Sequence, residues 1–152
     1  MNYWLMKSEP SEFSIDDLAA RPNQTEPWDG VRNYQARNMM RDDMKIGDQA
    51  FFYHSNCEEP GIVGVMEVTH ESYPDVTAFD KNDKHYDPKS DIDNPRWFLI
   101  NIKFIKKLQR TITLKELKEQ KELNNFPLNR RGNRLSIMPV TNEQWSFILS
   151  LE

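Results

Sequence analysis

The chain has 152 residues, with 20 Lys and Arg, 24 Asp and Glu, and 17 aromatic residues (4 Trp, 5 Tyr and 8 Phe). This length fits one domain, residues 1–152, and the aromatic side chains supply enough apolar surface for a core. A single cysteine excludes a disulfide framework and a cysteine-rich zinc site within the chain, and no apolar run approaches the roughly 18–20 residues of a membrane span.

The first elements are predicted from local patterns. Tyr3–Lys7 is short and aromatic-rich and favours a strand that ends in a turn. Ser14 begins a capping box that opens a short helix over Ile15–Ala20, and Pro22 stops it. We expect Thr25–Gly30 to be a loop.

The next segment predicts a helix and then a hairpin. Either Asn33 or Asn38 caps a helix that runs to about Lys45. The stretches Gln49–Ser55 and Gly61–Val68 are then typical of two strands joined through a turn.

Residues 69–95 hold 7 Asp and Glu against 3 Lys and several prolines, so we expect a long acidic excursion with a short helix. Trp97–Leu108 is the clearest strand of the chain. Apolar residues alternate along it at the period of two of a half-buried strand: Phe98, Ile100, Ile102 and Phe104.

Near the C-terminus, Thr113 begins a capping box for a helix to about Leu123. Leu135–Met138 predicts a last short strand that Pro139 ends, and Thr141 caps a terminal amphipathic helix. The count is five or six strands and four short helices, without a strand–helix–strand rhythm. We therefore expect an α+β fold, a small mixed β-barrel decorated by short helices.

Charge is distributed unevenly along the chain. Residues 1–100 hold 10 Lys and Arg against 19 Asp and Glu, net −9, whereas residues 101–152 hold 10 against 5, net +5. A basic loop carries three arginines around Gly132: Arg130, Arg131 and Arg134. Such a face suits nucleic-acid phosphates, although a solvated surface explains the same pattern. The first seven residues show no basic n-region or cleavage site, so we expect a cytoplasmic location.

Signals for catalysis and for metals are sparse. Cys57 follows His54 by three residues, and a Cys–His pair can form an activated nucleophile, but no third orienting group is marked. His54, His70 and His85 are too dispersed for a metal motif. The acidic run Asp87–Asp93 lacks the glycine and terminal glutamate of a calcium loop. We therefore expect neither a metal nor a cofactor.

Trp28 stands out because it lies in a polar, turn-rich stretch. It either plugs the end of the barrel or forms a wall of an aromatic pocket, where a nucleobase stacks for about 1–3 kcal/mol. His54, Ser55 and Asn56, at the end of their strand, offer hydrogen-bond partners for a base edge.

Five ordered blocks of residues resemble those of the EVE domain family. They cover nearly the whole chain: 3–10 (YWLMKSEP), 28–38 (WDGVRNYQARN), 52–56 with 61–64 (FYHSN and GIVG), 73–75 (YPD) and 134–140 (RLSIMPV). The resemblance implies a PUA-like pseudo-barrel that is related to the YTH readers of methylated adenine in RNA. It also implies a non-catalytic pocket for a modified nucleobase, with 5-methylcytosine in DNA as the leading candidate and RNA as an alternative.

The resemblance also implies roles for individual residues. Trp28 forms the aromatic wall, and a base from a duplex must flip out to reach it. The base-binding pocket is expected to comprise Lys7, Ser8, Trp28, Val31, Arg32, Asn33, His54, Ser55, Asn56 and Ser136. Phosphate contacts are expected from Arg37, Arg130, Arg131 and Arg134.

Two other classes of function stay open. One is a small enzyme that acts on a nucleic acid or a nucleotide through His54 and Cys57. The other is a protein-interaction module, whose partner docks on the acidic segment 69–95 or on the basic C-terminal part.

Overall fold

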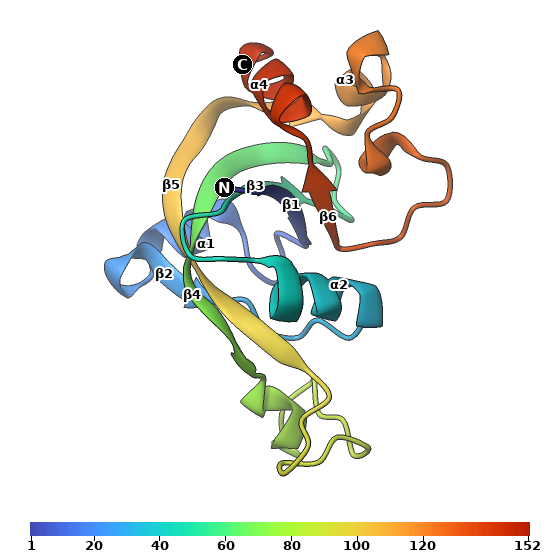
Figure 1. Cartoon of the computed structure of the whole chain (residues 1–152). Coiled ribbons are helices and arrows are strands. Elements are labelled where there is room, and N and C mark those ends of the chain that lie inside the picture. The colour runs from blue at the N-terminus through green and yellow to red at the C-terminus, as the bar shows by residue number, and fades with distance from the viewer.

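A six-stranded mixed sheet organises the chain in the computed structural model, which describes all residues 1–152 (Figure 1). Its order is β2-β5-β4-β3-β1-β6, and only β1 and β3 pair in parallel. The strands are β1 (Tyr3–Ser8), β2 (Thr25–Pro27), β3 (Gln49–His54), β4 (Gly61–Pro74), β5 (Phe98–Thr113) and β6 (Ile137–Val140). The N-terminal strand β1 therefore lies inside the sheet, between β3 and β6.

Four short helices accompany the sheet: α1 (Ile15–Ala20), α2 (Tyr34–Asn38), α3 (Leu114–Lys118) and α4 (Asn142–Ser150). The predicted caps Ser14, Thr113 and Thr141 each accept a backbone N–H of their own first turn, and Asn33 rather than Asn38 caps α2. The boxes at Ser14 and Thr141 are reciprocal. At Thr113 only half of the box forms, because the Glu116 carboxylate pairs with Arg110 instead of reaching back to the cap.

Several elements continue in altered geometry beyond these helices. A π-helical turn, Met39–Asp43, extends α2, so the helix predicted to run to about Lys45 ends two residues earlier. Short 3₁₀ turns occupy Pro22–Gln24, Val76–Phe79, Lys121–Leu123 and Pro127–Asn129. None of the helices is both long enough and apolar enough to cross a membrane.

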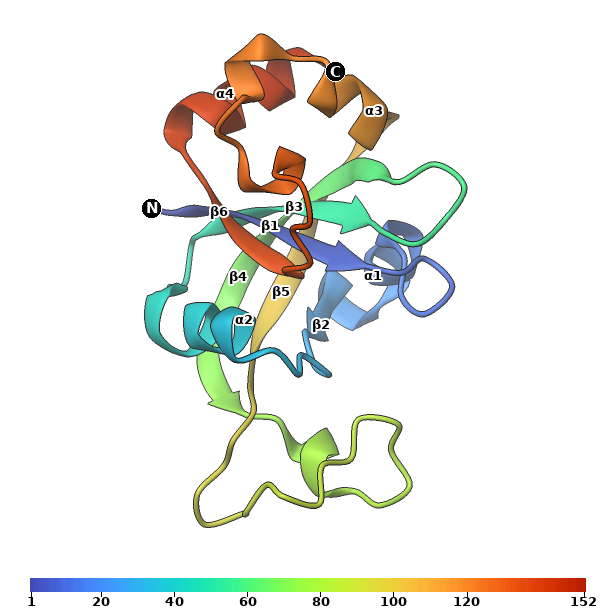
Figure 2. The same cartoon turned by 90° about the vertical axis from the view of Figure 1, so that its right-hand side faces the viewer.

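The central strands are buried on both faces. Trp4 and Met6 of β1 face one apolar cluster, whereas Leu5 faces the other. On β3, Phe52 joins the first cluster and Phe51 the second, as the alternation of a strand requires. Helices α1 and α2 cover the first cluster and α3 and α4 the second, on opposite sides of the sheet (Figure 2).

Irregular pairing bends β4 and β5 into a curved ribbon. The register between them shifts at four places, and such bulges increase the local twist. The sheet stays open because β2 and β6 are both edges. The predicted class, an α+β fold with six strands and four short helices around a barrel-like sheet, is confirmed. At Gly64 a Cβ would lie 2.6 Å from Ile15 Cδ1, so this glycine lets α1 pack directly on the ribbon.

The structure corrects four strand predictions. The strands predicted to end at Val68 and Leu108 continue to Pro74 and Thr113, because they pair with each other over this longer range. Thr25–Pro27, predicted to be loop, adds to the sheet as edge strand β2. Pro139 lies within β6 instead of ending it, because β6 is an edge strand and needs no outward N–H there.

Candidate functional site

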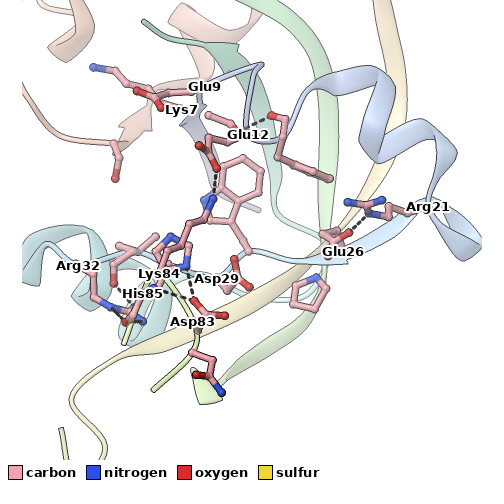
Figure 3. Close-up of a pocket in the computed structure, with 18 residues that line it drawn as sticks. Lys7, Glu9, Glu12, Arg21, Glu26, Asp29, Arg32, Asp83, Lys84 and His85 are labelled. Carbon is pink, nitrogen blue, oxygen red and sulfur yellow. Dashed lines mark hydrogen bonds and ion pairs between the residues drawn. The ribbon is translucent and has the colours of Figure 1, made fainter. Parts of the chain in front are cut away.

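A cavity of about 960 Å³ opens between the end of β1, the segment before α1, the loop 27–32 and the segment 82–85 (Figure 3). Segments 27–32 and 82–85 are distant in sequence, and the β4–β5 connection brings them together (Figure 2). The cavity is lined by Lys7, Ser8, Glu9, Glu12, Phe13, Arg21, Glu26, Pro27, Trp28, Asp29, Gly30, Val31, Arg32, Asn82, Asp83, Lys84, His85 and Ser136. Six of the ten predicted pocket residues are among them.

Trp28 belongs to the core and to the cavity lining at once. Its side chain is 8% exposed, and its ring meets Phe52 edge-on at a centroid distance of 5.5 Å and Phe13 at 6.4 Å. Its backbone N–H donates to the Ile100 carbonyl oxygen over 2.8 Å, which continues the β2–β5 pairing. The ring is therefore held rigidly, as a stacking surface requires.

The end of β1 supplies the opposite rim of the cavity. The Lys7 N–H donates to the Ser136 carbonyl oxygen over 2.8 Å, which ties β1 to the segment before β6. The Ser8 hydroxyl donates to the Phe13 carbonyl oxygen over 2.6 Å, so its oxygen can only accept from a ligand. Burial lowers the pKa of Lys7, whose Nζ lies 5.9 Å from the centre of the Tyr53 ring.

Arg32 joins the loop 27–32 to the β4–β5 connection. Its guanidinium donates to the His85 carbonyl oxygen over 2.7 Å, to Asp75 Oδ2 over 3.1 Å and to Thr77 Oγ1 over 3.2 Å. It also lies 5.5 Å from the centre of the Trp97 ring. With its donors committed in this way, Arg32 shapes the cavity wall more than it offers a free cation.

Asp75 is the fully buried centre of this junction. Burial raises the pKa of Asp75, but hydrogen bonds from Thr77, the Gly30 N–H and Arg32 outweigh burial and hold it below its ordinary value. The Gly30 N–H reaches Asp75 Oδ2 over 2.9 Å. Gly30 has φ +80°, and a Cβ there would lie 2.5 Å from the His85 ring, so only glycine allows this close approach.

The other four predicted pocket residues lie outside the cavity lining. Asn33 accepts the Ala36 N–H as the cap of α2. His54 Nε2 accepts the Ile15 N–H over 3.1 Å, and burial lowers the pKa of His54, so the ring is held in its neutral form. Asn56 donates to Glu9 Oε1 over 2.8 Å, and the Ser55 N–H donates to the Ser8 carbonyl oxygen. These side chains support the walls instead of facing the cavity.

The predicted phosphate contacts are spread over two regions. Arg37 donates to the Arg96 carbonyl oxygen over 2.8 Å. Arg130 and Arg131 line a second cavity of about 480 Å³ beside α3. Arg134 is exposed and lines neither of these two cavities.

The acidic lining and the segment 82–85 were missed from the sequence. Lys84 pairs with Glu12 and Arg21 with Glu26 across or beside the opening (Figure 3). Asp29 was the one residue with an available signal, since it directly follows Trp28 in the best-matching block. Desolvation by the cavity walls, and next the Asp75 carboxylate, raise the pKa of Asp29.

The alternative catalytic pair is not assembled. The ring nitrogen of His54 is engaged by the backbone of Ile15, and Cys57 lies in the turn between β3 and β4 without a hydrogen bond to His54. No group of three or more His, Cys, Asp or Glu side chains is arranged to hold a metal ion.

Comparisons with known proteins place this geometry in a family. Human "Thymocyte nuclear protein 1" is 51% identical over 168 residues, which covers 99% of this chain and 74% of that protein. A crystal structure from Pseudomonas syringae superposes with a TM-score of 0.94 at 49% identity and covers 98% of both chains. Human THYN1, solved in complex with 5-methylcytosine containing DNA, superposes with a TM-score of 0.91 at 49% identity and covers 99% of this chain and 97% of that one.

A more distant likeness concerns the fold alone. The YTH domain of the Zygosaccharomyces rouxii MRB1 protein superposes with a TM-score of 0.58 at 13% identity. Together these likenesses confirm the predicted PUA-like fold and its relation to YTH domains. The family described as "EVE domain" matches residues 2–151. The chain therefore belongs to the EVE domain family.

Proposed function

We propose that this chain is a non-catalytic reader of a modified nucleobase in DNA, with 5-methylcytosine as the first candidate. The observation that carries the proposal is the cavity walled by Trp28, in a chain that is 49% identical to a human protein solved with 5-methylcytosine containing DNA. A volume of about 960 Å³ is at the upper end of the range of small-molecule sites and leaves room for a base and its sugar.

The charge of the cavity favours a base over a phosphate as its occupant. Five carboxylates line it against four Lys and Arg side chains, and two of those cations are already paired with carboxylates in the lining. A phosphate gains little in such surroundings, whereas a neutral base can hydrogen-bond and stack. The backbone then contacts the basic surface that carries Arg130, Arg131 and Arg134.

The energies of base binding set what discrimination to expect. Flipping a base from a duplex costs a few kcal/mol, and stacking on Trp28 offsets this by about 1–3 kcal/mol. A single buried methyl group adds about 0.8 kcal/mol, or roughly fourfold in affinity. The reader is therefore expected to prefer the methylated base modestly unless polar groups also reject competing bases. Single-stranded RNA, which needs no flipping, is the secondary candidate polymer.

The test is a titration of matched single- and double-stranded oligonucleotides that carry cytosine or 5-methylcytosine at one site. Trp28→Ala is expected to weaken binding at least tenfold, since it removes the stacking surface. Because Trp28 also packs in the core, Ser136→Trp serves as a second variant that fills the mouth of the cavity without removing core atoms.

Ser150→Trp, on the exposed end of α4, is the matched control and should bind like the wild type. If folded Ser136→Trp and Trp28→Ala proteins both keep wild-type affinity for the modified oligonucleotide, the cavity is not the reading site and the proposal is wrong.

A further inference from the structure

Asp29 is the one carboxylate in the cavity lining that no group of the protein engages. The other four each accept a hydrogen bond or form an ion pair: Glu9 with Asn56, Glu12 with Lys84, Glu26 with Arg21, and Asp83 with the His85 N–H. Asp29 lines the same cavity without any such partner (Figure 3).

The position of Asp29 is fixed on both sides by the backbone. The Trp28 N–H donates to the Ile100 carbonyl oxygen over 2.8 Å, and the Gly30 N–H donates to Asp75 Oδ2 over 2.9 Å. The carboxylate is therefore held next to the stacking surface and cannot move away to find a partner elsewhere. Its environment also disfavours the charge, because desolvation, and next the Asp75 carboxylate, raise the pKa of Asp29.

An unpaired carboxylate at such a place is typical of a binding site that lacks its ligand. The chemistry of the ligand follows from the acceptor. A carboxylate only accepts hydrogen bonds, and among base edges it recognises the exocyclic amino group, such as the N4 amine of cytosine. Thymine presents the O4 acceptor at that position, and its single N3–H lies between two carbonyl oxygens whose lone pairs repel a carboxylate.

We propose that Asp29 selects bases that carry an exocyclic amino group, by accepting a hydrogen bond from that amine while the base stacks on Trp28. This inference rests on the proposed function and adds to it the group that reads the base edge. The role is a needed one, because 5-methylcytosine and thymine share the same methyl group. A pocket that read only shape and the methyl group would bind both.

The experiment compares 5-methylcytosine with thymine at one site of a single-stranded oligonucleotide, where no pairing partner differs between the two. The wild type is expected to prefer 5-methylcytosine about tenfold or more. Asp29→Asn is expected to bring the two affinities within about threefold of each other, because an amide can accept from the amine or donate to O4.

Asp93→Asn is the matched control, since it removes the same charge from an exposed carboxylate outside the cavity. It should keep the wild-type preference. If wild type binds both bases equally, or if Asp29→Asn keeps the wild-type preference, the role of Asp29 is wrong.

The Ser136→Trp variant separates this failure from failure of the proposed function. If Ser136→Trp abolishes binding while Asp29→Asn keeps the preference, the cavity reads the base through another group. If Ser136→Trp binds as wild type does, the reading site lies elsewhere and both proposals fall together. Thermal unfolding of Asp29→Asn should show a melting temperature no lower than that of wild type, which excludes misfolding as the cause of lost discrimination.

Discussion

At Asp29 the fold holds a carboxylate that its own neighbours disfavour. Desolvation by the cavity walls comes first, then the Asp75 carboxylate, with smaller repulsion from Asp83 and Glu26 and partial relief from His85. A raised pKa in the folded state means that the charged form is less stable there than in the unfolded chain. Recognition of a base amine and stability of the empty protein therefore oppose each other at this residue.

The first consequence is a pH-dependent gain in stability for Asp29→Asn. The cost of the charge is fully present above the folded-state pKa of Asp29 and vanishes below its ordinary value of about 4. At neutral pH the variant should be more stable than wild type, by less than about 1 kcal/mol because the side chain is exposed to solvent. Urea unfolding at pH 7 and at pH 3 measures this, and a variant that is less stable at pH 7 would contradict it.

Among the elements, the connection between β4 and β5 is attached to the cavity by the Arg32–Asp75 junction. Asp75 accepts hydrogen bonds from the guanidinium, from the Gly30 N–H and from Thr77. The partners lie 43 and 45 residues away along the chain for Arg32 and Gly30, so the junction fixes two distant segments against each other. The wall that carries Trp28 and the wall that carries His85 are therefore expected to move together.

Asp75→Asn should loosen this junction. The amide leaves Arg32 without its buried counter-charge, and we expect a loss of about 2–3 kcal/mol in the free energy of unfolding at neutral pH. Because the folded-state pKa of Asp75 is lowered, its contribution is present above about pH 4 and is lost as the pH falls through the folded value. The gap between wild type and variant should therefore narrow in acid.

Urea unfolding from pH 7 to pH 2.5 measures this gap, with exposed Asp93→Asn as the control that should unfold like wild type at each pH. A constant gap over that range would show that the charge of Asp75 is not what holds the junction.

At the scale of the whole molecule, the two faces of the sheet divide the work. The Trp28 cavity opens beside one apolar cluster, and the second, smaller cavity with Arg130 and Arg131 lies beside α3, on the side of the other. Lys7 lines both cavities from the end of β1. A strand that passes over this end of the sheet can place one base in the first cavity and its phosphates along the basic loop.

This arrangement predicts that the arginines act on affinity and not on base choice. Replacing Arg130, Arg131 and Arg134 together by Ala should lower the slope of log affinity against log salt by about 2, at roughly 0.7 per lost contact with a single strand. The preference for 5-methylcytosine over cytosine should be unchanged. Salt titrations of both oligonucleotides test this, with Lys45→Ala, an exposed change outside both cavities, as the control.

Much of the fold can be predicted from short-range patterns. The alternation around Phe51 and Phe52 assigns opposite faces of β3, and the caps at Ser14 and Thr141 begin their helices where expected. The ends of β4 and β5 cannot be predicted in this way, because pairing between the two strands extends both beyond the region of clear alternation. Trp28 was a candidate from the sequence because an aromatic ring in a turn-rich stretch is conspicuous.

The sequence by itself determined the α+β class, the family blocks and the residues at the end of β1 and around Trp28, because periodicity and caps act over a few residues. Only the tertiary structure decided that segment 82–85 closes the cavity, that Asn33 and His54 spend their polar groups on helix ends, and that Asp29 remains without a partner. Which carboxylate is paired depends on side chains 3 to 72 residues apart. A hydrogen bond needs atoms within about 3 Å, and only the folded chain brings such atoms together.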